Sequence, residues 1–434
     1  MAEVKRRVMN NRPGASFGKF LLLWSGQLIS SVGSGLTSFG LGIYVFQQTG
    51  QASAMALVTL LAFLPSLLLS AFAGVLADRY DRRLLMVAGD GLSALGLVFI
   101  LLCMLGGEAQ LWQICAGVTI SSVFSSLLEP AYKATVTDLL TEEQYTKASG
   151  LVQVAGSAKF LISPVIAGLL LSVADITLLL ILDIATIVVT IVTTLVVRSR
   201  LASKPYEQTR SFVQELKEGW SAVAGNRGVL MLVMMTSLLT FFIGFIETLF
   251  IPMLLAFTDS AVVGTLETVV ASGMLVSSAI LGFLPIKKNY VNILSFSFFG
   301  IGVFMAAFGF RENLVLITVS GFFFFAMLPY ANACLDYLIR INMEPSVQGR
   351  GWAMIGVLSQ LGFVAAYALS GVLADYVFTP LLVEGGTLAG SVGRIIGTGS
   401  GRGTGLLIIL AGVLLCVTSV FLYRLKSVRK LEWR

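Results

Sequence analysis

The chain has 434 residues, of which 56% are hydrophobic and 12% are charged, and its mean hydropathy is +0.90. A soluble domain carries about 25% charged residues, so this composition indicates a membrane protein. The sequence contains no histidine, which excludes Ser-His-Asp and Cys-His catalysis, HExxH zinc sites and histidine proton relays.

The remaining chemistry-bearing motifs are equally sparse. Four cysteines lie in apolar segments without C-x-x-C spacing, which is typical of buried free thiols, although a disulfide between Cys103 and Cys115 stays open. The stretch GTGSGRG at 397–403 lacks the G-K-[ST] ending of a phosphate-binding loop, and we interpret it as a flexible external loop. We therefore expect no metal, no cofactor and no direct use of ATP.

A spanning helix needs about 20 mainly apolar residues. This window predicts twelve transmembrane helices, at 20–45, 52–76, 84–105, 111–136, 150–172, 176–197, 229–257, 261–284, 290–310, 313–338, 351–376 and 404–423. The fold class is therefore an all-α membrane protein. The basic N-terminal lead is interpreted as preceding the first spanning helix rather than as part of a cleaved signal.

The basic residues follow this topology. With both termini placed in the cytoplasm, 25 of the 29 lysines and arginines fall in the termini and the loops on that side. Arg311, Arg394 and Arg402 fall outside, and Lys159 falls within a predicted helix. This asymmetry follows the positive-inside rule, so the net charge of +6 indicates membrane orientation and no nucleic-acid surface.

The longest interior loop, 198–228, divides the chain into six-helix halves at 1–197 and 229–434. Apolar residues at Phe212, Leu216 and Trp220 recur at helical spacing, which predicts an amphipathic helix on the inner membrane surface. A docking surface for a partner is the alternative. Weak repeats between the halves favour a transporter built from two related bundles.

One charged loop, GVLADRYDRR at 74–83, separates two long apolar segments. It resembles the loop between helices 2 and 3 of the major facilitator superfamily, and the matching residues are Gly74, Leu76, Asp78, Arg79, Arg82 and Arg83. Asp81 stands where the family usually has glycine. The resemblance implies a gating loop that locks the inward-closing surfaces of the two halves, and the alternative is an ordinary positive-inside anchor. The second GVLAD, at 371–375, is interpreted as a coincidence of composition.

Further stretches resemble the macrolide-efflux-type branch of that superfamily, the third group of drug:proton antiporters. They lie at 60–83, 129–151, 348–362 and 397–407. Residues 160–168 resemble the family's antiporter motif, with Pro164 and Gly168 in its pattern and with Ser163 and Ala167 replacing two of its glycines, and this match favours export. Many relatives carry an acidic residue after a glycine of the first helix, where this chain has Gly33-Ser34.

Ionisable residues within predicted spans are candidates for function, because each is costly in hydrocarbon. Asp90 and Glu129 lie close to the gating loop along their helices, and we expect them to pair with its arginines, with a role as proton carriers as the alternative. Asp183, Glu247 and Lys159 lie farther from the basic loops.

A carboxylic acid in a poorly hydrated site can carry a proton near neutral pH. We therefore expect Asp183 and Glu247 to couple transport to protons, with Lys159 as a counter-ion. Structural pairing or contact with headgroup water is the alternative, and it is the preferred interpretation for Glu267.

Polar residues recur at helical spacing on the first and seventh spans, which occupy equivalent places in the two halves. They are Gln27, Ser31, Ser34 and Ser38 on the first, and Thr236 and Thr240 on the seventh. We expect them to line the substrate cavity, and small-residue helix packing is the alternative.

Together these features predict a monomeric secondary transporter in a bacterial cytoplasmic membrane. The resemblance implies proton-coupled efflux of bulky amphipathic compounds such as macrolides by alternating access. Transport of another solute, such as a siderophore, a lipid or a metabolite, remains open, as does a membrane binding protein that does not transport. Mid-membrane acidic residues favour a transporter, since a non-transporting protein gains little from them.

Overall fold

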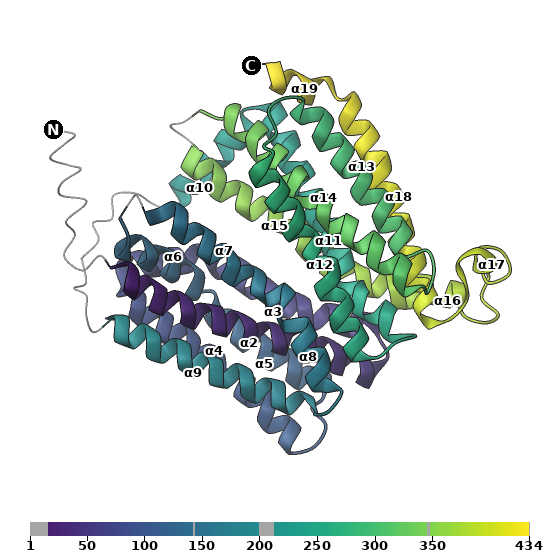
Figure 1. Ribbon diagram of the computed structural model, residues 1–434, viewed down its shortest axis with the longest axis horizontal. Helices are drawn as coiled ribbons and strands as arrows, with labels where there is room; N and C mark the ends of the chain where they lie inside the picture. The colour runs from purple at the N-terminus through teal and green to yellow at the C-terminus, as the bar shows by residue number, and fades with distance from the viewer. Residues whose placement is uncertain (1–15, 142–143, 199–211, 345–347, 434) are drawn as a thin grey trace. The chain divides into compact units, whose positions relative to one another are not determined.

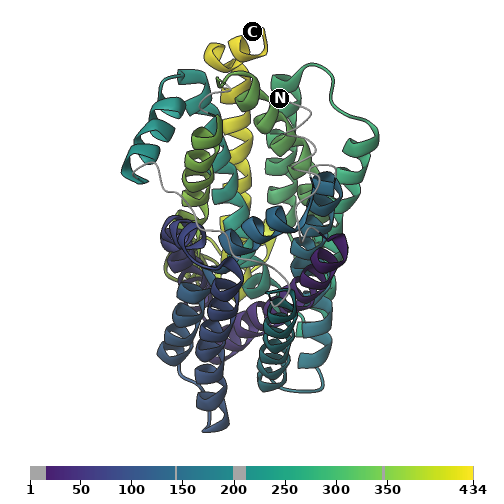
Figure 2. The ribbon, with the colours of Figure 1, turned by 90° about the vertical axis from the view of Figure 1, so that its left-hand side faces the viewer.

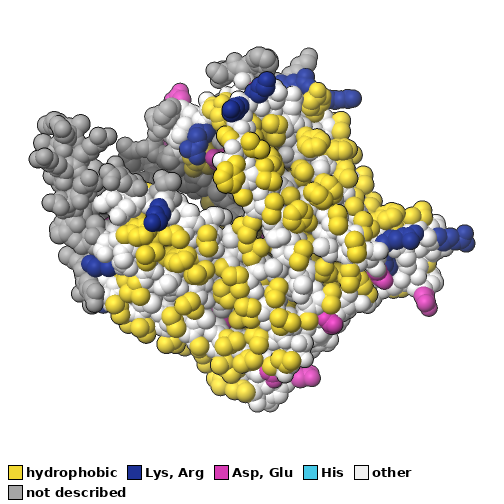
Figure 3. All heavy atoms as spheres, in the orientation of Figure 1, with side chains coloured by type: hydrophobic (Ala, Val, Ile, Leu, Met, Phe, Trp, Pro, Cys, Tyr) yellow, Lys and Arg dark blue, Asp and Glu magenta, His cyan; other side chains and the backbone are white. Residues whose placement is uncertain are grey.

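The computed structural model describes residues 16–141, 144–198, 212–344 and 348–433. Within these ranges, twelve helical segments are long and apolar enough to cross a membrane. The predicted all-α membrane fold with twelve transmembrane helices is therefore confirmed (Figure 1). On the face shown in Figure 3, hydrophobic side chains cover most of the helices, and charged side chains gather near helix ends and loops.

Most of the twelve segments in the described ranges are single helices. They are α2 (Phe17–Thr49), α3 (Ala52–Arg79), α4 (Arg82–Leu105), α9 (Ile176–Arg198), α11 (Arg227–Leu255), α12 (Ser260–Phe283), α13 (Tyr290–Phe308), α14 (Leu314–Ile341) and α18 (Ser400–Arg424).

The other segments are broken, and a proline lies in the first turn of the last piece of each. A proline is tolerated there because the first amides of a helix have no intrahelical partner. The pieces are α5 (Leu111–Ser125) with α6 (Leu128–Leu139), α7 (Tyr145–Leu161) with α8 (Ser163–Leu171), and α15 (Gln348–Val372) with η2 (Leu373–Phe378) and α16 (Thr379–Leu382). The prolines are Pro130, Pro164 and Pro380.

The chain forms two compact units. The first comprises Met1–Tyr44 and Val58–Gln208, and the second comprises Val45–Leu57 and Thr209–Arg434, as far as each is described. The long helices within each unit run alongside one another (Figures 1 and 2). The short segment 45–57, which joins α2 to α3, belongs to the second unit although the rest of these helices belongs to the first.

Within the first unit, α2 lies against α9 along a row of glycines seven residues apart, Gly26, Gly33 and Gly40. A β-carbon at Gly26 would collide with Thr193, and one at Gly33 would lie only 2.9 Å from Asp183 Oδ1. Small residues at these positions let the two backbones approach closely, as in many membrane bundles.

Glycines have the same role in the second unit, where α13 packs against α18. A β-carbon at Gly302 would lie 2.6 Å from the Gly412 carbonyl oxygen, and one at Gly412 would lie 2.6 Å from that of Gly302. The two helices therefore meet backbone to backbone.

The glycine-rich stretch at 397–403 differs from the expected flexible loop. Helix α18 begins at Ser400, and Arg402 is only 1% exposed. Its guanidinium donates to the carbonyl oxygens of Gly309 at 2.8 Å and Phe310 at 2.9 Å, which lie just beyond the end of α13. Cationic groups stabilise helix C-termini in this way, so the second half of the stretch is an ordered structural element.

The predicted linker helix is present as α10 (Phe212–Ala224), and it packs against α15 and α11. Val223 is buried and Trp220 is half exposed. The side chains of Phe212 and Leu216, on which the predicted apolar face also depends, lie outside the described residues.

Candidate functional site

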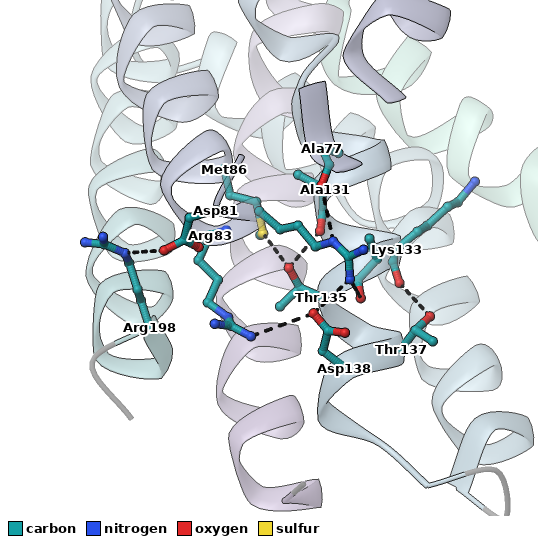
Figure 4. Close-up of polar contacts among 12 residues, drawn as sticks. Ala77, Asp81, Arg83, Met86, Ala131, Lys133, Thr135, Thr137, Asp138 and Arg198 are labelled. Carbon is teal, nitrogen blue, oxygen red and sulfur yellow. Dashed lines mark hydrogen bonds and ion pairs between the residues drawn. The ribbon is translucent and has the colours of Figure 1, made fainter. Parts of the chain in front are cut away.

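The charged loop joins α3 to α4 through Tyr80 and Asp81. Asp81 caps α4, because its carboxylate accepts a hydrogen bond of 3.0 Å from the Arg83 amide. Its second oxygen accepts from Arg198 Nε at 2.8 Å (Figure 4). Partial burial alone would raise the pKa of Asp81, but the hydrogen bonds from Arg198 and from the Arg83 amide hold it below its usual value. An aspartate thus supplies an N-cap, which glycine could not make with a side chain.

Two arginines of the loop converge on Asp138 of α6. Arg82 donates to the Asp138 carboxylate at 2.9 Å and to the Ala77 carbonyl oxygen at 3.2 Å. Arg83, which is 5% exposed, lies 3.8 Å from the same carboxylate (Figure 4). Asp138 thus ties α6 to the start of α4. Nothing in the sequence alone singles out Asp138, although it lies in the stretch 129–151 that carries part of the family resemblance.

The two acidic residues expected to pair with this loop lie elsewhere. Glu129 pairs with Lys133 of its own helix at 2.5 Å, and both side chains are exposed. Asp90 is buried, seven residues along α4 from Arg83, which is about 10 Å of helix rise and too far for an ion pair. The expected pairing of Glu129 is therefore corrected. The side chain of Asp78 lies outside the described residues, and Gly74 and Arg79 lie at the end of α3.

A buried acidic pair lies within the first unit. Asp183 of α9 and Asp90 of α4 are each 3% exposed, and they interact electrostatically. Asp183 also interacts with Lys159, and the Thr186 hydroxyl lies 3.5 Å from its carboxylate. Asp183 thus interacts with both Lys159 and Asp90, and the expected roles of Asp183 and Lys159 in coupling stay predictions.

A second acidic cluster lies within the second unit. Glu247 of α11 accepts a hydrogen bond from the Tyr367 hydroxyl of α15. Glu267 of α12 interacts electrostatically with Glu247, and among the described residues its Oε2 has no hydrogen-bond partner and no appreciable exposure. Tyr367 could not be selected from the sequence, because nothing in an apolar segment marks which tyrosine will reach an acid on another helix.

The polar stripe of α2 is only partly sheltered. Gln27, Ser31 and Ser34 are half-buried, and Ser38 is exposed and donates to the Ser34 carbonyl oxygen of its own helix. Its side chains therefore remain available at the surface of this unit.

The polar stripe of α11 is used differently. Thr236 donates to the Leu232 carbonyl oxygen of its own helix, and Thr240 donates to the Ser359 carbonyl oxygen of α15 at 2.5 Å. A β-carbon at Gly362 of α15 would collide with Thr240. For Thr240, this geometry favours helix packing, the alternative left open by the sequence.

The antiporter-like residues lie where α8 begins. Ser163 is fully buried and donates to the Val32 carbonyl oxygen of α2 at 2.9 Å. Pro164 and Gly168 follow on the buried face of α8. The motif therefore fixes α8 against α2. In the described part of the chain, no cluster of three or more acidic or cysteine side chains could hold a metal ion.

Comparison with known proteins agrees with this architecture. The model of the Major Facilitator Superfamily matches residues 23–367. The chain is 26% identical over 368 residues to Macrolide efflux protein A of Streptococcus pyogenes, covering 82% of this chain and 89% of that protein. It is 27% identical over 321 residues to Macrolide efflux protein A of Enterococcus faecalis, covering 71% of this chain and 98% of that protein.

Solved structures share the fold at low sequence identity. The nucleoside transporter NupG superposes with a TM-score of 0.72 at 13% identity, covering 94% of this chain and 100% of that chain. A bacterial homologue of the iron transporter ferroportin superposes with a TM-score of 0.69 at 12% identity, covering 94% and 99%. Because the family model spans most of its length, this chain belongs to the Major Facilitator Superfamily of transporters, as a multi-pass membrane protein that is not an enzyme.

Proposed function

We propose that this protein is a secondary active exporter of bulky amphipathic compounds of the macrolide type. The observation that carries the proposal is its similarity, over most of both chains, to two proteins named Macrolide efflux protein A. We place it in a bacterial cytoplasmic membrane as a monomer with both termini inside, because its lysines and arginines are distributed in that sense.

We further propose that export is driven by protons through alternating access. The supporting feature is the presence of acidic residues in the interiors of both units, Asp183 with Lys159 in the first and Glu247 in the second. Carboxyl groups removed from water can bind and release a proton as their surroundings change. In this proposal Asp183 and Glu247 bind the coupling proton, and Lys159 acts as a counter-ion.

The loop Gly74–Arg83 is proposed to control access to the substrate. Its arginines hold α6 through Asp138, and its Asp81 holds the end of α9 through Arg198. Three helix ends are thus joined by charges that can be exchanged between conformations. The polar residues of α2, Gln27, Ser31, Ser34 and Ser38, are proposed to line the substrate path, together with Thr236 of α11.

The test is the accumulation of a labelled macrolide in an efflux-deficient bacterium, with and without this protein. We expect the protein to lower accumulation and a protonophore to abolish the difference. Asp183→Asn and Glu247→Gln should abolish export, whereas Asp175→Asn and Glu384→Gln, at exposed carboxylates, should not. Unchanged accumulation of several macrolides and dyes would refute drug export and leave the transport of another solute, or a binding protein that does not transport, to be tested.

A further inference from the structure

Within the described part of the chain, the buried carboxyl group of Asp90 has no hydrogen bond or ion pair that would balance a negative charge. Asp90 is 3% exposed, and its Oδ2 has no hydrogen-bond partner among the described residues. An ionised carboxylate in such a place loses its hydration without compensation, which disfavours the charged form. Its position on α4 excludes an ion pair with Arg83, because Arg83 lies two turns away on the same helix and pairs with Asp138.

Among the residues that the structure describes, the charged group that interacts with Asp90 is another acid, Asp183. Helix α5 carries no acidic or basic residue. The charges of α6 are paired among themselves or with the loop, Glu129 with Lys133 and Asp138 with Arg82. From α9, Asp183 interacts electrostatically with Asp90.

The two acids differ in their surroundings. Asp183 has Lys159 nearby, and the hydroxyls of Thr37 and Thr186 lie beside its carboxylate. These groups stabilise a negative charge on Asp183. Asp90 has none of these groups beside it. When both acids are ionised and Lys159 is charged, the cluster of three residues has one net negative charge, and a single proton on Asp90 would neutralise it.

We propose that Asp90 and Asp183 form one proton-binding site, in which Asp90 holds the proton and Asp183 keeps its charge beside Lys159. The inference deepens the proposed function by moving the proton of the first unit from Asp183 to its neighbour Asp90. It rests on proton coupling for its role in transport but not for the existence of the site. The bound proton completes the O–H bond of the Asp90 carboxylic acid. When a change of conformation admits water to Asp90, this bond breaks, the proton passes to water and the carboxylate is left hydrated.

The geometry around Asp183 explains why the site is rigid on one side. Gly33 of α2 brings its backbone against Asp183 and Thr186, and a β-carbon there would collide with both side chains. The Asp183 side chain of α9 is therefore held against α2, and a change at Asp90 on α4 alters its electrostatic surroundings directly.

The test is infrared difference spectroscopy of the purified full-length protein during a pH titration. We expect a band from a protonated carboxylic acid that is absent from Asp90→Asn, restored in Asp90→Glu and unchanged in Asp175→Asn, an exposed carboxylate at the start of α9. An unaltered band in a folded Asp90→Asn protein would overturn the assignment. So would loss of the band when sodium replaces potassium, because the site would then bind a metal cation.

A second variant keeps the test decisive if Asp90→Asn does not fold. Asp183→Asn removes the neighbouring charge and should move the midpoint of the band by about one pH unit or more. An unchanged midpoint would show that the two acids are independent. If the protein shows this band but exports no macrolide, the proton-binding site is supported and the proposed function is refuted. If it exports macrolides in a proton-driven manner but lacks the band, the proposed function is supported and the site is refuted.

Discussion

The carboxylate of Asp375 accepts a hydrogen bond of 2.7 Å from the backbone amide of Ser53, although the two residues are 322 positions apart in the chain. Its other oxygen accepts from the Ala52 amide at 3.1 Å. Ala52 and Ser53 begin α3, so Asp375 caps a helix that it does not belong to. Gly371 allows this approach, since a β-carbon there would lie 2.7 Å from the Ala52 carbonyl oxygen. The second GVLAD of the sequence thus has a structural role of its own.

Asp375→Ala should loosen the start of α3. Loss of a cap costs about 1 kcal/mol, which corresponds to a roughly fivefold increase in the population of any state with this contact broken. A cysteine at Ala52, which is 1% exposed, would report the change through its rate of labelling by a maleimide. Glu384→Ala, at an exposed acid of the same unit, is the control. Equal labelling rates in the two variants would mean that the cap contributes nothing.

Arg402→Met should destabilise the second unit, because it leaves the carbonyl groups of Gly309 and Phe310 without their donor. The bond to Gly309 is buried and the bond to Phe310 is partly buried, and a buried carbonyl left unsatisfied costs about 1–3 kcal/mol. Thermal unfolding of the detergent-solubilised protein measures this loss. Arg394→Met removes an exposed arginine of the preceding helix, α17 (Gly393–Ile396), and should leave the melting temperature unchanged. A similar melting temperature for both variants would contradict the structural role of Arg402.

Asp138→Asn should weaken the loop, because Arg82 and Arg83 share this one carboxylate. The pair with Arg82 is partly exposed, so its contribution is about 1 kcal/mol or less, and we expect transport to fall by up to roughly fivefold. Glu129→Gln, which breaks an exposed pair on the same helix, should retain full transport. If the two variants reverse this order in the accumulation assay, Glu129 rather than Asp138 supports the loop.

The sequence identified the spans correctly because hydropathy depends on each segment by itself. All twelve segments appear as helices, and Asp183 is buried near Lys159. Pairing depends instead on the rotation of each helix. Glu129 and Asp138 are nine residues apart on α6, which places them on opposite sides of a helix with about 3.6 residues per turn. Only one of them can therefore face the loop.

Contacts between distant parts of the chain could not be predicted from one sequence. Tyr367 meets Glu247 over 120 positions and Asp375 meets Ala52 over 323, and both contacts depend on how the helices pack. The prediction of a flexible loop at 397–403 was wrong from Ser400 onward for a related reason. A run of glycines indicates a loop when the chain is considered alone. Here the glycines make room for the buried side chain of Arg402, which lies against Gly397 and Gly405.

Gly33→Ala should damage the first acidic site without removing an ionisable group. The added β-carbon would lie 2.9 Å from Asp183 Oδ1 and would collide with Thr186. Overpacking of this kind costs about 1–3 kcal/mol, so export should fall together with the melting temperature. Gly156→Ala is the matched control, since a β-carbon there meets nothing within 4 Å. Full export by Gly33→Ala would show that α2 can move away from Asp183 at no cost.

Tyr367→Phe tests the second acidic cluster by deleting one hydroxyl group. The hydrogen bond that Tyr367 donates to Glu247 is charge-assisted when Glu247 is ionised, and such a bond contributes about 1.5–3 kcal/mol. Its loss alters the balance between the two protonation states of Glu247 by roughly tenfold or more. Proton-driven export should therefore fall by about that factor, whereas exchange of labelled for unlabelled substrate without a proton gradient should persist. The control is Tyr376→Phe, at an exposed tyrosine of η2, which should change neither rate. If Tyr367→Phe lowers both rates equally, Tyr367 contributes to substrate binding or packing instead of coupling.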